Sequence, residues 1–167
     1  MAGHCSKEIR RFEEGKAKTT MIVTIFPYIA GEKEFQKFRD ADILITFEKA
    51  KSELDYSDLP AKQGREDITH RALKKYAKKL LESNGADDVE FESSLIDVSS
   101  RKLRVVVECG DTPIYRIWDM LFAQDYGRWI KEVWCVYCIE YDIEIVKFVK
   151  PPKLLEYERE IGWFPER

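Results

Sequence analysis

No stretch of this 167-residue sequence has the roughly 18 consecutive apolar residues that a membrane-spanning helix requires. The segment from Met1 to Lys18 is rich in charge and lacks the apolar core of a secretory signal. The four cysteines do not form the pattern of a disulfide framework. These absences predict a protein of the cytoplasm that makes no contact with a membrane.

Two kinds of catalytic motif are also missing. The sequence has no glycine-rich loop of the kind that binds phosphates, and no Ser/His/Asp set with a recognisable spacing. Phosphate-loop NTPases and acyl hydrolases are therefore excluded. Side-chain amides are scarce, because asparagine occurs once and glutamine three times. Few amides beside abundant lysine and glutamate are typical of proteins from very hot environments, which indicates a thermophilic source.

Charged residues make up 35% of the chain and hydrophobic residues 44%, which is typical of a globular protein. The net charge of −3 gives the whole molecule no attraction for nucleic acid, so binding would need a local basic patch. The candidate patch runs from Arg71 to Lys79 and contains five positive charges. Its alternative interpretation is an ordinary solvated helix face. If the patch binds nucleic acid, the contacting residues are His70, Arg71, Lys74, Lys75 and Lys78.

The order of the expected elements is clear from residue 64 onward. A helix begins within Gly64–Asp67, has apolar residues at helical spacing from Ile68 to Leu81, and ends at Asn84-Gly85. A second helix, with Thr112 as its N-cap and Pro113 in its first position, reaches about residue 126. Alternating, β-branched or continuous apolar patterns predict strands over 88–93, 95–99, 103–109, 133–139 and 143–149.

These elements divide the chain into four expected segments. Residues 1–18 are a flexible tail, and residues 19–60 form a small N-terminal β extension with strands over 20–29 and 43–47. Residues 64–150 form the core, and residues 151–167 are a C-terminal tail of helix or loop. The predicted fold is α/β, with a mixed central sheet flanked by helices.

Cys135 and Cys138 form a Cys-x-x-Cys motif, which in other settings binds zinc or performs redox chemistry. Here the motif lies in a predicted strand, where residues three apart point to opposite faces of the sheet. No second motif of this kind and no nearby histidine supplies further zinc ligands. We therefore expect two structural cysteines.

The most informative feature is a pair of acids, Asp97 and Glu108, on two short predicted strands. A tight hairpin centred on Lys102-Leu103, midway between them, would place them side by side. Glu108 follows three valines of a buried strand, where an ionised side chain is costly unless a cation or metal compensates it. The alternative is that Asp97 caps a turn and that Glu108 pairs with Arg104 or another base at a strand end.

The acids and the order helix, three strands, helix, strand together resemble the core of the PD-(D/E)XK nuclease superfamily over residues 64–141. In this resemblance Asp97 is the first acid of the signature, with Ile96 in place of the usual proline, and Glu108 is the second. Glu66 stands where an acid of the first helix often joins them. The resemblance implies a restriction-endonuclease-like core.

The sequence departs from the family pattern two residues beyond the second acid, where Gly110 replaces the expected lysine. Arg116 on the following helix is the implied substitute. An arginine stays protonated and cannot act as a base, but it can stabilise charge on a phosphate. The implied cofactor is Mg²⁺ or Mn²⁺, held by Asp97 and Glu108 with the backbone carbonyl of Cys109 as a third ligand.

The resemblance implies a metal-dependent phosphodiesterase that acts on nucleic acid, with DNA as the expected substrate. The implied catalytic residues are Asp97, Glu108, Glu66 and Arg116. The alternative, from a different functional class, is a catalytically degenerate module that binds nucleic acid or a protein partner. The sequence leaves open whether DNA or RNA is bound, whether DNA is cut at ends or internally, and whether the protein forms a homodimer.

Overall fold

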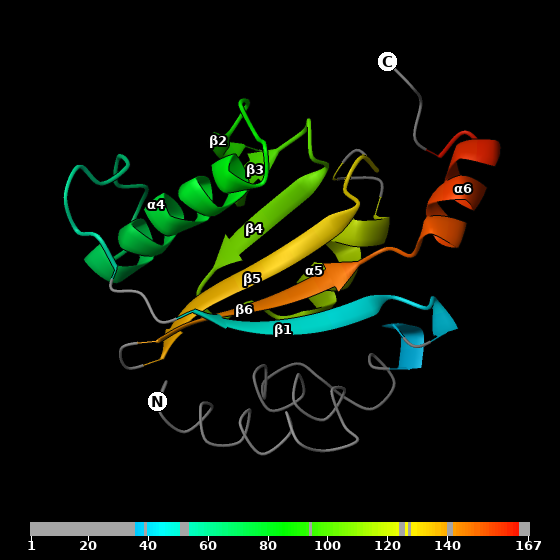
Figure 1. Ribbon diagram of the computed structural model, residues 1–167, viewed down its shortest axis with the longest axis horizontal. Helices are drawn as coiled ribbons and strands as arrows, with labels where there is room; N and C mark the ends of the chain where they lie inside the picture. Colours follow the sequence, from blue (N-terminus) through cyan, green and yellow to red (C-terminus); the bar gives the residue numbers. More distant parts are fainter. Residues whose placement is uncertain are drawn as a thin grey trace.

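The part of the chain described by the computed structural model folds around a mixed sheet of six strands, in the order β1-β6-β5-β4-β3-β2 (Figure 1). The described residues are 36–38, 40–50, 54–93, 95–123, 126, 128–139 and 142–163. The strands are β1 (Leu44–Ala50), β2 (Glu90–Ser93), β3 (Ile96–Ser100), β4 (Val105–Cys109), β5 (Glu132–Ile139) and β6 (Asp142–Val149). The helices are α4 (Ile68–Ser83), α5 (Ile114–Phe122) and α6 (Pro152–Glu160).

Four neighbouring strands follow the predicted order of the core. β2, β3 and β4 pair antiparallel in succession, and β5 then pairs parallel with β4 after the chain has passed through α5. A parallel neighbour requires such a crossover, because the chain must return to the same end of the sheet. β6 pairs antiparallel with β5, and β1 with β6. The α/β class and the mixed central sheet with flanking helices are confirmed.

Helices α4 and α5 cover opposite faces of this sheet (Figure 1). Leu73 and Leu81 of α4 lie in one apolar cluster together with Val107 of β4, whereas Leu121 of α5 lies in the other cluster with Val106. Successive side chains of a strand point to opposite faces, so β4 contributes to both clusters. β4 is buried along its whole length, as its run of valines predicts.

Helix α4 begins and ends as its sequence predicts. Asp67 is the N-cap residue, and its side chain accepts a hydrogen bond from the backbone N–H of His70 at 2.7 Å. Asn84 is the C-cap residue, and Gly85 follows with a φ of +100°, a conformation that a residue without Cβ adopts without strain. Ile68, the first apolar residue of this spacing, is exposed in the first turn of the helix.

Helix α5 begins one residue later and ends earlier than predicted. Its N-cap residue is Pro113, whose backbone is extended, so Thr112 does not cap it. The hydroxyl of Thr112 instead donates to the carbonyl of Gly110 at 3.4 Å. The helix ends at Phe122 because Ala123 has an extended backbone, with a ψ of 141°.

β1 and α6 are the first and the last of the helices and strands described above. β1 adds to the edge of the central sheet next to β6, which confirms the predicted strand, although it covers Leu44–Ala50 and not 43–47. α6 follows Pro151, and its buried Glu158 pairs with the buried Lys150 at 2.9 Å. The predicted tail over 1–18, the predicted strand over 20–29 and Cys5 lie outside the described residues, and the segment boundaries stay predictions.

The cysteines of the Cys-x-x-Cys motif lie on opposite faces of β5, as predicted. Cys135 is buried in the apolar cluster on the α5 face, and Cys138 packs against the cluster on the α4 face. Both are free thiols. Within the described ranges, no helix is long and apolar enough to cross a membrane.

Candidate carboxylate site

The register of the β3–β4 hairpin places Asp97 opposite Glu108. Val98 pairs with Val107, and extending this antiparallel register by one residue brings the two acids across from each other. The hairpin is therefore centred on Lys102-Leu103, as the spacing of the acids predicts. Paired residues of antiparallel strands point to the same face, and a side-chain hydrogen bond joins the two carboxyl groups.

The two carboxyl groups have opposite pKa shifts. Burial raises the pKa of Glu108 to about 8, and the negative charge of Asp97 adds to the rise. Burial also disfavours the charged form of Asp97, but hydrogen bonds from His70, from Glu108 and from the backbone N–H of Cys109 hold its pKa below the usual value. The N–H of Cys109 lies 2.8 Å from Asp97 Oδ2. At neutral pH the pair therefore holds one proton, which a bound cation would displace.

Helix α5 supplies the base that contacts Glu108. Arg116 lies in the first turn of α5, and its Nε and Nη2 atoms donate to Glu108 Oε1 at 3.0 and 2.8 Å. Nη2 also donates to the backbone carbonyl of Leu95, in the connection between β2 and β3. Glu108 thus pairs with a base other than Arg104, which bears out this part of the structural alternative. Nε of Arg104 donates to the carbonyl of Trp129 at 2.8 Å. Arg116 therefore contacts the acid that the sequence analysis takes as the second of the pair.

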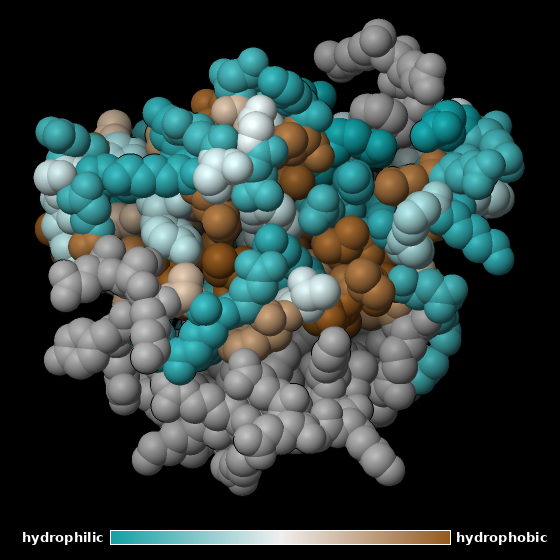
Figure 2. Space-filling model, viewed as in Figure 1, coloured by the Kyte–Doolittle hydropathy of each residue, from teal (hydrophilic) through white to brown (hydrophobic). Residues whose placement is uncertain are grey.

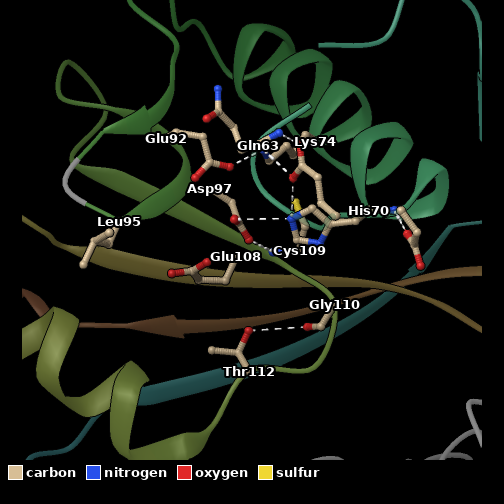
Figure 3. Close-up of polar contacts among 12 residues, drawn as sticks. Gln63, His70, Lys74, Glu92, Leu95, Asp97, Glu108, Cys109, Gly110 and Thr112 are labelled. Atoms are coloured by element: carbon tan, nitrogen blue, oxygen red, sulfur yellow. Dashed lines mark hydrogen bonds and ion pairs between the residues drawn. The ribbon is translucent and has the colours of Figure 1, made fainter. Parts of the chain in front are cut away.

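The space beside Gly110 is occupied by a side chain of α4. Gly110 has a φ of +87°, and a Cβ atom placed on it would lie 3.9 Å from His70 Nδ1. His70 Nε2 lies 3.4 Å from Asp97 Oδ1 and 3.4 Å from Glu66 Oε2 (Figure 3). The hydrogen bond with Asp97 raises the pKa of His70 although burial acts against it. His70, which the sequence assigns to phosphate contact, therefore lies among the acids.

Lys74 is the centre of a second polar cluster next to this pair. Its side chain has no exposed surface, and Nζ lies 2.8 Å from Glu66 Oε2 and forms a second ion pair with Glu92. Burial lowers the pKa of Lys74, but the contacts with the two carboxylates outweigh burial, and the net shift is upward. Glu66 also accepts a hydrogen bond from the backbone N–H of Gln63 at 2.7 Å. Glu66 is therefore held by Lys74, Gln63 and His70 immediately before α4.

Glu66, His70 and Glu92 form a group that could hold a metal ion, since one ligand atom from each lies within 4.8 Å of the others. Two carboxylates and an imidazole are ordinary ligands of divalent metals. This group and the predicted pair, Asp97 and Glu108, are neighbours, because His70 contacts both Glu66 and Asp97.

Glu92 is a site residue that the sequence analysis misses. Phe91 pairs with Val98, so the β2–β3 register places Glu92 opposite Asp97. With Glu108 on β4, three acids then lie in a row across three neighbouring strands. The signal that could have found Glu92 is the two-residue connection between β2 and β3, a length typical of tight hairpins.

The burial of Lys74 is also missed, although its spacing carries a signal. Glu66, His70 and Lys74 are four residues apart in sequence. Residues at this spacing lie on the same side of a helix. A row of one acid, one imidazole and one ammonium group beside an apolar stripe indicates a polar contact that runs along the edge of the buried face.

The basic stretch of α4 lies only partly on the surface. Lys74 has no surface with which to contact a phosphate, which corrects the prediction for this residue, because two acids hold its ammonium group inside. Arg71 and Lys75 both donate hydrogen bonds to the segment 55–60 that precedes the helix. The side chain of Lys78 is 47% exposed. Hydrophilic residues cover α6 and much of α4 on the viewed face (Figure 2).

Comparison with known proteins finds no family model that matches the chain, and no curated protein or solved structure that matches it significantly. The resemblance to the PD-(D/E)XK core rests on the order of the elements and on the positions of the acids.

Proposed function

We propose that this protein is a metal-dependent nucleic-acid phosphodiesterase, a DNA endo- or exonuclease with a restriction-endonuclease-like core. The observation that supports it is the pair Asp97 and Glu108, which the β3–β4 register brings together at the ends of two strands. The pair lies within the order helix, three strands, helix, strand, and helices of both faces reach it. Two adjacent acids in such a position suit the binding of a cation better than a purely structural role.

The donor set fits Mg²⁺ or Mn²⁺, which are bound through hard oxygen ligands. Asp97 and Glu108 would hold the ion, with the backbone carbonyl of Cys109 as a third ligand. Burial, and after it the charge of Asp97, raise the pKa of Glu108 to about 8, and a dication beside both carboxyl groups would offset these two effects by favouring the charged form. When bound, the metal supplies an activated water and neutralises charge on the scissile phosphate.

The residues of the chain itself would position the substrate and the acids. Arg116 uses Nε and Nη2 for Glu108 and Leu95, and a guanidinium has five N–H donors, so its other terminal nitrogen can donate to a phosphate oxygen. His70 orients Asp97 through its contact with Oδ1. Glu66 in turn contacts His70 and thereby contributes to the site without touching Glu108.

Cleavage of plasmid DNA in the presence of Mg²⁺ or Mn²⁺ tests the proposal. We expect cleavage by the wild type and none by Asp97→Asn or Glu108→Gln. Glu90→Gln is the matched control, because Glu90 is an exposed acid on the neighbouring strand β2, and this variant should cut DNA like the wild type. Circular dichroism of each variant shows whether the fold is retained. Equal cleavage by wild type and Asp97→Asn would refute the assignment.

A catalytically degenerate binding module is the second candidate, and the absence of a side chain at Gly110 favours it. DNA binding without cleavage under any divalent metal would support the module against the enzyme. The exposed lysines of α4 then define the expected contact surface, because Lys78 and Lys79 are 47% and 64% exposed. Replacing both with glutamine should weaken binding and reduce its salt dependence. Unchanged binding would place the contact surface elsewhere.

A further inference from the structure

A lysine ammonium group lies inside a cluster that has the composition of a divalent-metal site. The ligand atoms of Glu66, His70 and Glu92 lie within 4.8 Å of one another. Nζ of Lys74 lies 2.8 Å from Glu66 and is paired with Glu92, and its side chain has no exposed surface. Lys74 and His70 extend from α4 toward Glu92 and Asp97 (Figure 3).

We propose that Lys74 is a built-in cation that occupies the position of a second metal, so that this site takes one divalent ion and not two. The inference rests on the proposed function for the position of that one ion, at Asp97 and Glu108. Lys74 is a positioning residue, because it holds Glu66, which contacts His70, which contacts Asp97.

The charge balance of the cluster supports a single ion. Four carboxylates face two permanent cations, the side chains of Lys74 and Arg116. When a bound ion displaces the proton of the Asp97–Glu108 pair and His70 is neutral, the four acids leave two negative charges in the substrate-free protein, and one divalent ion matches them. A second divalent ion would leave an equal excess of positive charge, which is costly where side chains are largely removed from water. The four acids are Glu66, Glu92, Asp97 and Glu108.

Displacement of Lys74 by a metal is also unfavourable. A metal bound to Glu66 and Glu92 would take both carboxylates from the ammonium group, which would then be buried without an anion. The ammonium is joined to the chain and is already within the cluster, whereas a metal ion has to be taken from solution. The wild-type cluster therefore excludes a divalent ion from the position between Glu66 and Glu92.

The number of bound Mn²⁺ ions per chain tests this inference, measured from the electron paramagnetic resonance signal of the unbound ion. We expect one ion on the wild type. Lys74→Met has a side chain of similar length without charge, and we expect two ions on it. Lys74→Met combined with Glu92→Gln removes a ligand of the second position and should bind one ion again. This double variant also removes one charge of each sign, so it should fold even if Lys74→Met needs metal to do so.

Thermal unfolding with and without Mn²⁺ gives a second measurement. If the ion takes the place of the ammonium group, Mn²⁺ should raise the melting temperature of Lys74→Met by more than that of the wild type. Two ions on the wild type, or the same number on the wild type and on Lys74→Met, would overturn the inference. No ion on the wild type but one on Lys74→Met would refute the metal site at Asp97 and Glu108 and support the role of Lys74.

Discussion

Replacing Glu108 with glutamine should stabilise the protein increasingly as the pH rises. In the folded chain, burial and the charge of Asp97 raise the pKa of Glu108 from 4.5 to about 8. Between these two values the folded protein binds a proton that the unfolded chain releases. Each pH unit in this window therefore lowers the free energy of unfolding of the wild type by about 1.4 kcal/mol. Glutamine has nearly the same size and does not titrate.

The pKa values set the size of the effect. The loss of stability begins near pH 4.5, reaches about 3 kcal/mol at pH 7 and levels off at about 5 kcal/mol above pH 8. The side chain of Glu108 is only 5% exposed, so water screens its charge little. The glutamine oxygen can still accept the hydrogen bonds from Arg116. Removing the charge of Glu108 also weakens its pairing with Arg116, and this adds a constant amount to the difference in the free energy of unfolding. The test is therefore how this difference changes with pH, and not its absolute value.

Urea unfolding in EDTA at pH 4.5, 7 and 8.5 measures this slope. The difference between Glu108→Gln and the wild type should grow in favour of the variant by about 5 kcal/mol across this range as an upper limit. The control Glu90→Gln removes an exposed acid of the same sheet, and its difference from the wild type should stay within about 0.5 kcal/mol at every pH. A difference for Glu108→Gln that stays constant with pH would refute the reasoning.

Two further predictions concern the same carboxyl pair. Arg116→Gln should lower the free energy of unfolding by about 1–3 kcal/mol at pH 7. This is less than is usual for a broken buried ion pair, because Glu108 can remain protonated. A loss above about 5 kcal/mol in urea unfolding would contradict this. Saturating Mn²⁺ should raise the melting temperature of the wild type more at pH 8.5 than at pH 5.5, because the ion binds carboxylates and competes with protons. Equal shifts in melting temperature at the two pH values would place the metal at other groups.

The Asp97–Glu108 part of the site could be predicted because it is local in sequence. The valines before Glu108 define a buried strand, and the spacing of the two acids defines the centre of the hairpin. Alternation along a strand and the geometry of a short turn then suffice to bring both acids to the same face. No contact with a distant segment is needed for this pairing.

The Lys74 cluster could not be predicted in the same way, because its members belong to different elements. Whether Lys74 points to water or inward depends on Glu92, which lies on β2, and on how α4 is placed against the sheet. A lysine in a basic stretch is usually exposed, and burial of its charge becomes favourable only when two acids lie within reach. Periodicity within α4 contains no information on the position of β2.

The contact of His70 with Asp97 is a similar case. The helix and the strand are separated by β2 in the chain, and the imidazole ring lies beside Gly110, where a Cβ atom would be 3.9 Å from Nδ1. The absence of a lysine at this position is visible in the sequence. Which side chain uses the space depends on the packing of α4.

The row of acids on β2, β3 and β4 has a consequence for how this protein assembles. A single meander brings the three carboxylates together, whereas their cations come from helices on either side of it in the chain, Lys74 from α4 and Arg116 from α5. Docking of one helix alone would remove these acids from water while only part of their charge is compensated. Each helix therefore makes the docking of the other more favourable. The two layers of the fold are thus coupled through charge.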